Sequence, residues 1–254
     1  MGSQISGKLI EGAEPLSVRS GTYGVLVLHG FTGNPQSMRP IADGCVEAGY
    51  SVEMPLLAGH GTRVEDMIPT RFPDYISDAR QAYTSLNDFC EKVIVVGLSM
   101  GGTLTLSLAL ENPDIRGIVL VNPLCEPPAP SFVEMMAATL ESGMDTFTGI
   151  GSDIAKEGCK ELAYPETPLA PLLSLFDAVS ELAPRLGGIE CPVLLYSSRQ
   201  DHVVPGSNGD LLESALGNRV ERKWLERSFH VATLDYDKDV IVGGTVDFAR
   251  RVFG

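Results

Sequence analysis

Short apolar runs, separated by stretches of helical length, constrain this chain of 254 residues more than any other feature. The clearest runs are residues 25–28 (Val-Leu-Val-Leu) and 93–96 (Val-Ile-Val-Val), which no polar residue interrupts. Unbroken apolar strands are typical of a parallel sheet that is buried on both faces. Parallel strands also need crossover connections, which are usually helices. The sequence therefore predicts an α/β fold with a mostly parallel central sheet and helices on both faces.

The same alternation predicts the positions of the individual elements. We expect strands at residues 24–28, 51–54, 92–96, 117–121, 193–197 and 220–225, and helices at 35–47, 73–86, 100–111 and 238–252. Pro35 and Pro73 stand where proline is tolerated in a first helical turn, and Gly49 and Pro113 follow two helix ends.

One segment interrupts this alternation. Between residue 123 and about residue 176 there is no convincing strand, and prolines separate short apolar helical pieces (Pro127, Pro128, Pro130, Pro165, Pro168 and Pro171). An unstructured loop of this length is uncommon inside a compact domain. We therefore expect a core made of residues 1–122 and 177–254 with an inserted helical lid, residues 123–176, called the predicted lid segment below.

The chemistry is carried by residues 97–101, Gly-Leu-Ser-Met-Gly, which follow one apolar run and precede the helix expected at 100–111. In this context GxSxG is typical of a serine held on a sharp strand-to-helix turn. The flanking glycines are needed because larger side chains would collide there. The turn presents the hydroxyl of Ser99 beside N–H groups of the helix N-terminus, which favour an oxyanion. We predict that Ser99 is a nucleophile; an incidental serine in a glycine-rich turn is the alternative.

A nucleophilic serine needs a base, and the base needs an acid that orients it. In such folds the chain order is serine, acid, histidine, and two histidines, His202 and His230, follow Ser99. Asp201 follows the strand expected at 193–197, and His230 follows the strand expected at 220–225. Sites in open α/β sheets gather at these carboxyl ends of strands. The sequence therefore predicts Ser99, Asp201 and His230 as a catalytic triad.

Other titratable residues near these positions have simpler interpretations. His202 is adjacent to Asp201, which puts its ring on a different side, so we interpret it as a packing or capping residue. Asp235 and Asp237 follow His230 and would reverse the order, so we interpret them as members of a solvated turn. His60 precedes Ser99, and a structural hydrogen bond is its expected role.

An oxyanion hole needs two N–H donors. One is expected from Met100, the residue after the nucleophile. The other is expected from the loop after an earlier strand, where residues 29–33 spell His-Gly-Phe-Thr-Gly. We predict Phe31 as this second donor, and the side chain of Phe31 can fill the core at the same time.

Composition limits the partners. With 19 Lys and Arg against 33 Asp and Glu, the net charge is −14, which repels polyphosphates and anionic lipid head groups. We therefore expect no nucleic-acid partner. No apolar run reaches 18 residues and no secretory signal is visible, so we expect no membrane span. Residues 1–6 match the short N-myristoylation pattern only formally. Nothing in the sequence indicates an oligomeric state.

The number and spacing of the cysteines indicate the cellular compartment. Cys45, Cys90, Cys125, Cys159 and Cys191 lie far apart without a CxxC pair, and an odd number cannot close into a complete disulfide set. Reduced thiols fit the cytosol, so a cytoplasmic location is expected.

Four stretches together resemble one family. They are residues 26–33 (LVLHGFTG), 97–103 (GLSMGGT), 201–205 (DHVVP) and 230–236 (HVATLDY). In these stretches the chain resembles the bacterial monoacylglycerol lipases and the related small bacterial carboxylesterases, from about residue 24 to the C-terminus. The resemblance implies the α/β-hydrolase fold with a helical lid, and hydrolysis of a small-molecule ester.

The resemblance also implies how a substrate is held. In that family the lid forms a tunnel for one acyl chain and a small polar pocket for glycerol, and a lid glutamate contacts the glycerol. It assigns this role to Glu161; a solvated carboxylate on a lid helix is the alternative. The lid residues that would line the tunnel are Met135, Met136, Leu140, Met144, Phe147 and Leu172, and packing of the lid on the core is their alternative role.

The combined hypothesis is ester hydrolysis through an acyl-enzyme on Ser99, with no metal and no cofactor. A short-chain carboxylesterase or thioesterase with the same triad is the first alternative, and a carbon–carbon bond hydrolase would also keep the serine. Epoxide hydrolases and haloalkane dehalogenases are disfavoured because they place an aspartate at the position of Ser99. A catalytically silent ligand receptor is the alternative from another class. Lipid-soluble substrates would allow transient membrane contact through the lid.

Overall fold

The computed structural model describes residues 7–149 and 151–254, so the N-myristoylation match lies outside the described residues. Its main sheet has seven strands in the order β1-β3-β2-β4-β5-β8-β9, and every neighbouring pair is parallel except β1 and β3. The strands are β1 (Leu16–Val18), β2 (Tyr23–Leu28), β3 (Ser51–Met54), β4 (Lys92–Leu98), β5 (Gly117–Val121), β8 (Val193–Ser198) and β9 (Val220–Leu225). All six expected strands are confirmed; β1, of three residues, is too short for a sequence pattern to reveal.

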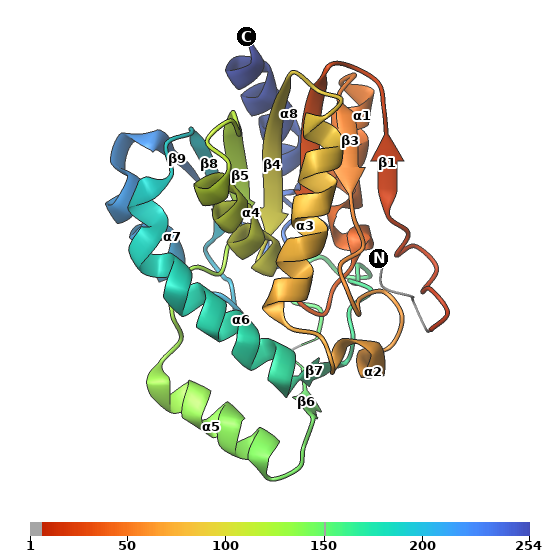
Figure 1. Ribbon diagram of the computed structural model, residues 1–254, viewed down its shortest axis with the longest axis vertical. Coiled ribbons are helices and arrows are strands. Elements are labelled where there is room, and N and C mark those ends of the chain that lie inside the picture. Colours follow the sequence, from red (N-terminus) through yellow and green to blue (C-terminus); the bar gives the residue numbers. More distant parts are fainter. Residues whose placement is uncertain (1–6, 150) are drawn as a thin grey trace.

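Helices cover both faces of this sheet (Figure 1). They are α1 (Arg39–Glu47), preceded by a 3-10 turn (Pro35–Met38), α2 (Val64–Met67), α3 (Phe72–Asn87), α4 (Met100–Glu111), α7 (Ser207–Leu216) and α8 (Lys238–Phe253). Three of the four expected helices are confirmed to within one residue at their ends, and the fourth, expected at 35–47, begins as the 3-10 turn and is α-helical from Arg39. The short helices α2 and α7 were not expected from the sequence.

The unbroken apolar runs are explained by two separate cores. Val25 and Val27 of β2 pack with α1 and α8, while Leu26 and Leu28 pack with α3, α4 and the helix α6 (Leu169–Leu182). Successive side chains of a strand point to opposite faces, so a strand between two cores has no solvent-facing position for a polar residue. Figure 1 shows α3 and α4 in front of the sheet and α8 behind it.

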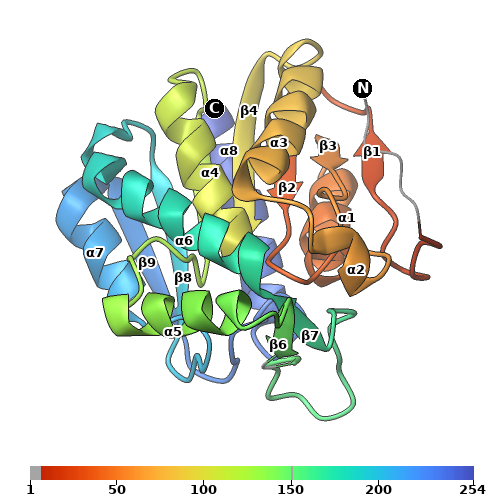
Figure 2. The ribbon, with the colours of Figure 1, turned by 60° about the horizontal axis from the view of Figure 1, so that its bottom comes forward.

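The segment between β5 and β8 is the part of the fold that the sequence predicts least clearly. It contains α5 (Pro130–Glu141), β6 (Thr146–Thr148), β7 (Glu166–Pro168) and α6, followed by a 3-10 turn (Ala183–Gly188). The expectation that residues 123–176 hold no strand is wrong, because β6 and β7 form a small antiparallel sheet. Strands of three residues cannot show a clear alternation. Figure 2 shows α5 beside α6, and in Figure 1 α6 lies between α5 and the main sheet. Residue 176 lies inside α6, and the division into core and lid stays a prediction.

No helix within residues 7–149 and 151–254 combines the length and the apolar character that crossing a membrane requires.

Candidate active site

Ser99 stands on the turn between β4 and α4 with φ +54°, a left-handed conformation that non-glycine residues rarely adopt. The glycines around it have the steric reason expected from the sequence. A Cβ on Gly97 would collide with the carbonyl oxygen of Gly101, and a Cβ on Gly101 would collide with that of Leu28. Strained backbone of this kind persists only where the surroundings enforce it, which is typical of a functional site.

Two backbone N–H groups are available beside Ser99. Met100 is the first residue of α4, and Phe31 lies in the loop after β2. A Cβ on Gly30 would lie 3.4 Å from the Cβ of Ser99, so this loop runs directly along the serine turn. Neither the N–H of Phe31 nor that of Met100 donates to any residue that the structure describes. The arrangement suits the stabilisation of an oxyanion.

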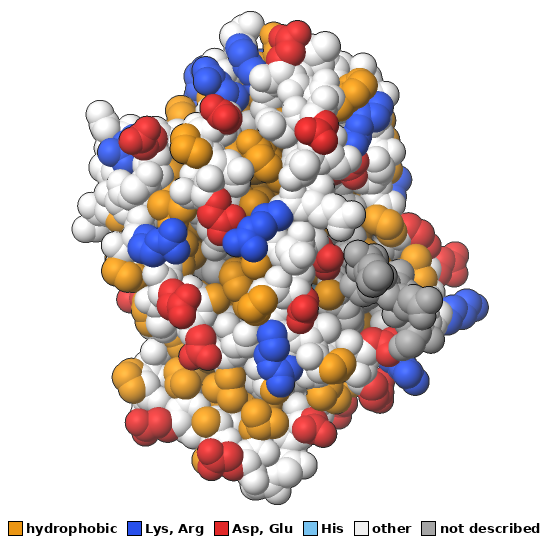
Figure 3. All heavy atoms as spheres, viewed as in Figure 1, with side chains coloured by type: hydrophobic (Ala, Val, Ile, Leu, Met, Phe, Trp, Pro, Cys, Tyr) orange, Lys and Arg blue, Asp and Glu red, His pale blue; other side chains and the backbone are white. Residues whose placement is uncertain are grey.

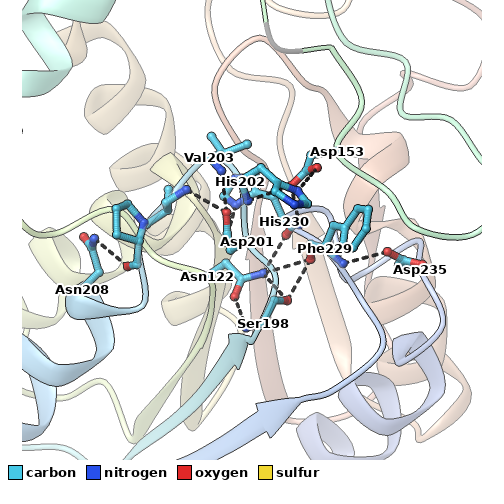
Figure 4. Close-up of polar contacts among 12 residues, drawn as sticks. Asn122, Asp153, Ser198, Asp201, His202, Val203, Asn208, Phe229, His230 and Asp235 are labelled. Atoms are coloured by element: carbon cyan, nitrogen blue, oxygen red, sulfur yellow. Dashed lines mark hydrogen bonds and ion pairs between the residues drawn. The ribbon is translucent and has the colours of Figure 1, made fainter. Parts of the chain in front are cut away.

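Asp201 and His230 form a buried pair (Figure 4). Oδ2 of Asp201 lies 2.8 Å from Nδ1 of His230, and both side chains are less than a tenth exposed. The other oxygen, Oδ1, accepts the N–H groups of Val203 (2.8 Å) and Val204 (2.7 Å). These bonds hold the carboxylate within its own loop, so that Oδ2 remains aimed at the imidazole.

The pKa of His230 is raised above its usual value. Burial of the ring lowers this pKa, but the carboxylates of Asp201, Glu161 and Asp153 outweigh it. The surroundings therefore stabilise the imidazolium form, which a general base needs when it takes a proton from serine.

Ser99 and His230 are not joined by a hydrogen bond among the described residues. The nucleophile–base hydrogen bond is often looser in an enzyme without substrate. The structure thus brings Asp201 and His230 into direct contact and supplies the turn that presents Ser99, while the roles of the three residues stay a prediction.

Asn122, which sequence reasoning missed, ties three segments together under this pair. It follows β5 with φ +44°, and its Nδ2 donates to the carbonyl oxygen of His230 (2.8 Å) and to Oγ of Ser198 (2.9 Å). Its Oδ1 accepts the N–H of Ser198 (2.7 Å). The available signal was an asparagine directly after an apolar strand, since asparagine tolerates the left-handed region.

Glu161 lies in an irregular stretch of the predicted lid segment and not on a helix. The residue is partly exposed, but its carboxyl group is buried and faces Gly33 and the hydroxyl of Ser37. Burial raises the pKa of Glu161 to about 7, although the nearby His230 and Ser37 favour the charged form. The structure therefore brings Glu161 to the histidine of the site; its contact with a substrate stays a prediction.

His60 and His202 both make structural contacts, as their sequence positions predict. Nδ1 of His60 is 2.9 Å from the carbonyl oxygen of Ala58, which confirms the expected structural hydrogen bond. Nδ1 of His202 is 2.8 Å from Oδ1 of Asp153, and its ring packs against Phe229. His202 is thus a loop residue and not the partner of Asp201.

The interpretation of Asp235 as a residue of a solvated turn is wrong. Asp235 is 2% exposed and accepts the N–H groups of Ala155 (2.7 Å), Lys156 (3.0 Å) and Phe229 (2.9 Å). A buried carboxylate is tolerated when backbone donors surround it. Two of these donors, Ala155 and Lys156, come from a segment about 80 residues away, so no local pattern could reveal them.

An apolar cluster begins beside the loop after β2. Phe31 and Leu124 pack against it, and its buried members are Met136, Leu169, Leu172 and Phe176, with Leu140 and Phe147 partly buried at its edge. Of the six residues expected along an acyl tunnel, Met136, Leu140, Phe147 and Leu172 belong to this cluster. Met135 and Met144 are about half exposed and lie outside it, because they occupy the solvent side of α5 and the turn after it.

Metal ligands do not gather anywhere in the described part of the chain: no group of three His, Cys, Asp or Glu side chains there could hold a metal ion.

Taken together, the doubly covered parallel sheet, the strained serine turn and the acid–histidine pair at the strand ends define a serine hydrolase of the α/β-hydrolase class. The family described as "Serine aminopeptidase, S33" (Hydrolase_4) matches residues 22–237. The chain belongs to this family.

Individual relatives narrow the comparison. The chain is 43% identical over 250 residues to a thermostable monoacylglycerol lipase of Bacillus sp. (strain H-257), covering 97% of this chain and 98% of that one. It is 28% identical to a carboxylesterase of Bacillus subtilis (strain 168), over 94% of this chain and 97% of that one. A structure solved in work on LipS and LipT, two metagenome-derived lipolytic enzymes, is 41% identical with a TM-score of 0.91, covering 96% and 100%. The expected resemblance to bacterial monoacylglycerol lipases and small carboxylesterases is confirmed.

Proposed function

We propose that this chain is a monoacylglycerol lipase, which releases a fatty acid and glycerol through an acyl-enzyme on Ser99. The observation that carries the proposal is the buried pair of Asp201 and His230, 2.8 Å apart, at the strand ends beside the serine turn. The 43% identity to a monoacylglycerol lipase over nearly the whole chain supports this substrate class. No metal ion and no cofactor enters the proposed reaction.

The proposed reaction has two halves. Oγ of Ser99 attacks the ester carbonyl carbon while His230 takes the hydroxyl proton, and the carboxylate of Asp201 stabilises the imidazolium. The oxyanion then collapses, the C–O bond to glycerol breaks, and His230 returns the proton to the leaving oxygen. Water attacks the acyl-enzyme with His230 again as base, and the fatty acid leaves with Ser99 restored. The N–H groups of Phe31 and Met100 hold the oxyanion in both halves.

The two ends of the substrate would meet different surroundings. The apolar cluster that starts at Phe31 and Leu124 suits an acyl chain, since buried methionine and leucine side chains adapt to chains of different length. The carboxyl group of Glu161, near Ser37 and His230, suits the hydroxyl groups of glycerol. This polarity gradient favours a monoester of glycerol over an ester with two bulky apolar sides.

We assign residues 123–176 to a lid over this site. Its helix α5 has one buried residue, Met136, while Phe132 and Met135 are exposed. Apolar side chains gather on the lower face in Figure 3, over α5 and α6, with acidic side chains around them. Transient contact with a neutral lipid surface follows from this patch, and sedimentation with neutral liposomes tests it: protein left entirely in the supernatant refutes the contact.

We place the protein in the cytoplasm. All five cysteines have free thiols, and Cys45, Cys90 and Cys125 are buried. Thiols that remain reduced are typical of the cytosol.

A substrate profile tests the proposed function. Purified protein is assayed on monoacylglycerols of increasing chain length, on di- and triacylglycerol, and on simple short esters and thioesters. Activity that peaks at medium or long monoacylglycerols, with little on di- and triacylglycerol, supports the proposal. A peak on short simple esters or thioesters supports the alternative carboxylesterase or thioesterase instead.

The nucleophile is tested separately. Ser99→Ala is expected to lower kcat by about 10⁴- to 10⁶-fold, and a fluorophosphonate probe is expected to label the wild type and not this variant. A folded Ser99→Ala protein that keeps more than a few per cent of its activity refutes the assignment.

A further inference from the structure

Asp153 joins the two loops that carry the acid and the base of the site (Figure 4). Its Oδ2 accepts the N–H of His230 (3.0 Å) and the N–H of His202 (3.2 Å), and its Oδ1 lies 2.8 Å from Nδ1 of His202. Its carbonyl oxygen accepts the N–H of Val231 (3.0 Å). One residue of the predicted lid segment therefore fixes the backbone at His230 and at the neighbour of Asp201.

The loop that carries His230 in turn binds the backbone next to Asp153. Asp235, from the loop that carries His230, accepts the N–H groups of Ala155 and Lys156, which follow Asp153. Each of the two segments thus contributes a carboxylate that binds the backbone of the other. Ile154, between these contacts, packs against the core on the α1 and α8 face of the sheet. The segment at residues 153–156 is therefore held rigidly against the histidine loop.

His230 is consequently held on both sides of its backbone. Asp153 accepts its N–H (3.0 Å), and Asn122 donates to its carbonyl oxygen (2.8 Å). Asp201 then fixes the ring through Nδ1. A side chain whose backbone is bound at both polar groups has little freedom to tilt, and catalytic geometry is sensitive to displacements of about 1 Å.

The same carboxylate acts on the charge of the ring. Three carboxyl groups face His230: Asp201 from the loop after β8, and Glu161 and Asp153 from the predicted lid segment. Their combined effect raises the pKa of His230, against the lowering effect of burial. The ring of His202, whose Nδ1 lies 2.8 Å from Oδ1 of Asp153, is exposed to solvent.

We propose that Asp153 is a positioning residue for the catalytic histidine, and that through it the predicted lid segment determines where His230 stands relative to Ser99. This inference rests on the function proposed above. It extends that function, because a segment expected to cover the substrate would also assemble the proton-transfer pair.

Asp153→Asn tests the proposal, because the amide keeps one acceptor oxygen and the shape of the side chain while it removes the charge. We expect kcat to fall by about 10- to 100-fold with little change in KM, since Asp153 acts through His230. The acid limb of kcat/KM is expected to move to lower pH, because losing a neighbouring negative charge lowers the pKa of His230. Glu157→Gln, an exposed carboxylate of the same segment, is the matched control and is expected to behave as wild type.

Asp153→Glu separates charge from position. Glutamate keeps the negative charge but displaces the carboxylate by one methylene group. We expect the acid limb to stay close to that of the wild type while kcat falls. Asp153→Ser, whose hydroxyl can still accept a backbone N–H, is the second variant if Asp153→Asn does not fold.

An NMR titration of the histidine ring protons gives a readout that does not depend on catalysis. His29 and His60, whose pKa values burial lowers to about 3 and about 4, stay neutral near pH 7. His202→Gln identifies the remaining two signals. A lower pKa of His230 in Asp153→Asn together with the loss of kcat supports the proposal, whereas an unchanged pKa or an unchanged kcat overturns it. If the wild type hydrolyses no ester, the proposed function fails, while the titration still reports the coupling of Asp153 to His230.

Discussion

Gly33 and Glu161, 128 positions apart in the chain, touch so closely that a Cβ on residue 33 would lie 2.5 Å from Oε1 of the glutamate. The loop around Gly33 also binds the backbone on either side of Glu161. The side chain of Asn34 donates to the carbonyl oxygen of Leu162, and that of Gln36 accepts the N–H of Leu162 (3.1 Å) and donates to the carbonyl oxygen of Lys160 (3.1 Å). The loop after β2 therefore determines where the carboxyl group of Glu161 stands.

Gly33→Ala is expected to displace Glu161 without touching the catalytic pair. The added methyl group must push the carboxyl group away, which removes the hydrogen-bond partner proposed for the glycerol group, so we expect KM for monoacylglycerol to rise by about tenfold. KM for a simple ester without glycerol is expected to stay the same, and steady-state kinetics on both substrates measure the difference. Gly243→Ala is the control, because a Cβ there meets no atom within 4 Å. Equal effects on the two substrates would contradict the assigned role of Glu161.

The pH dependence of Glu161→Gln follows from the charges around His230. The histidine acts as a base only when neutral, so activity is present above its pKa and is lost as the pH falls through it. The carboxylate of Glu161 contributes to the raised pKa of His230. Its removal lowers that pKa, so the acid limb of kcat/KM is expected to move to lower pH. An acid limb that stays in place or moves to higher pH would refute this coupling.

Asp201→Asn is expected to lower kcat by about 10⁴-fold, because the amide no longer stabilises the imidazolium or selects the tautomer with a proton on Nδ1. The bonds from Val203 and Val204 to Oδ1 can remain, so the loop is expected to keep its shape. Pre-steady-state and steady-state rates on one ester, together with the circular dichroism spectrum, check both statements. A folded variant with near wild-type kcat would show that another group orients His230.

Asp235→Asn tests how much the hydrogen bonds between the loop that carries His230 and the predicted lid segment contribute to stability. The amide nitrogen would face backbone N–H groups that now donate to a carboxylate, and leaving such buried donors unpaired costs about 2–4 kcal/mol of unfolding free energy. Urea denaturation measures this as a lower midpoint with an unchanged slope. Asp239→Asn, whose side chain is 94% exposed, is the control and is expected to change stability by less than about 0.5 kcal/mol. Similar midpoints for the two variants would show that the hydrogen bonds of Asp235 contribute little to stability.

Met136→Trp tests whether the apolar cluster holds the acyl chain, and the same substitution at the neighbouring Met135 is its control. Met136 is 7% exposed in the apolar cluster, whereas Met135 is 53% exposed. The larger ring at residue 136 is expected to block the cluster and shift the chain-length optimum to shorter acyl groups, while Met135→Trp leaves the optimum unchanged. Chain-length profiles of both variants decide the matter, and a profile of Met136→Trp that matches the wild type would place the acyl chain elsewhere.

The sequence alone determined the central sheet and the serine turn, because both depend on local physics. Strands buried on both faces must be apolar throughout, as residues 25–28 and 93–96 are, and a sharp turn around Ser99 must be flanked by Gly97 and Gly101. The order of Ser99, Asp201 and His230 then follows from the carboxyl ends of successive strands.

Only the tertiary structure decided how the surroundings of His230 are assembled. Asp153, Asn122 and Asp235 gain their importance from partners that are 49 to 108 positions away along the chain. Hydrogen bonds between such distant segments leave no periodic signal in the sequence. Burial raises the pKa of Glu161, whereas neighbouring carboxylates raise that of His230 against the effect of burial, and both surroundings exist only once the segments have packed together.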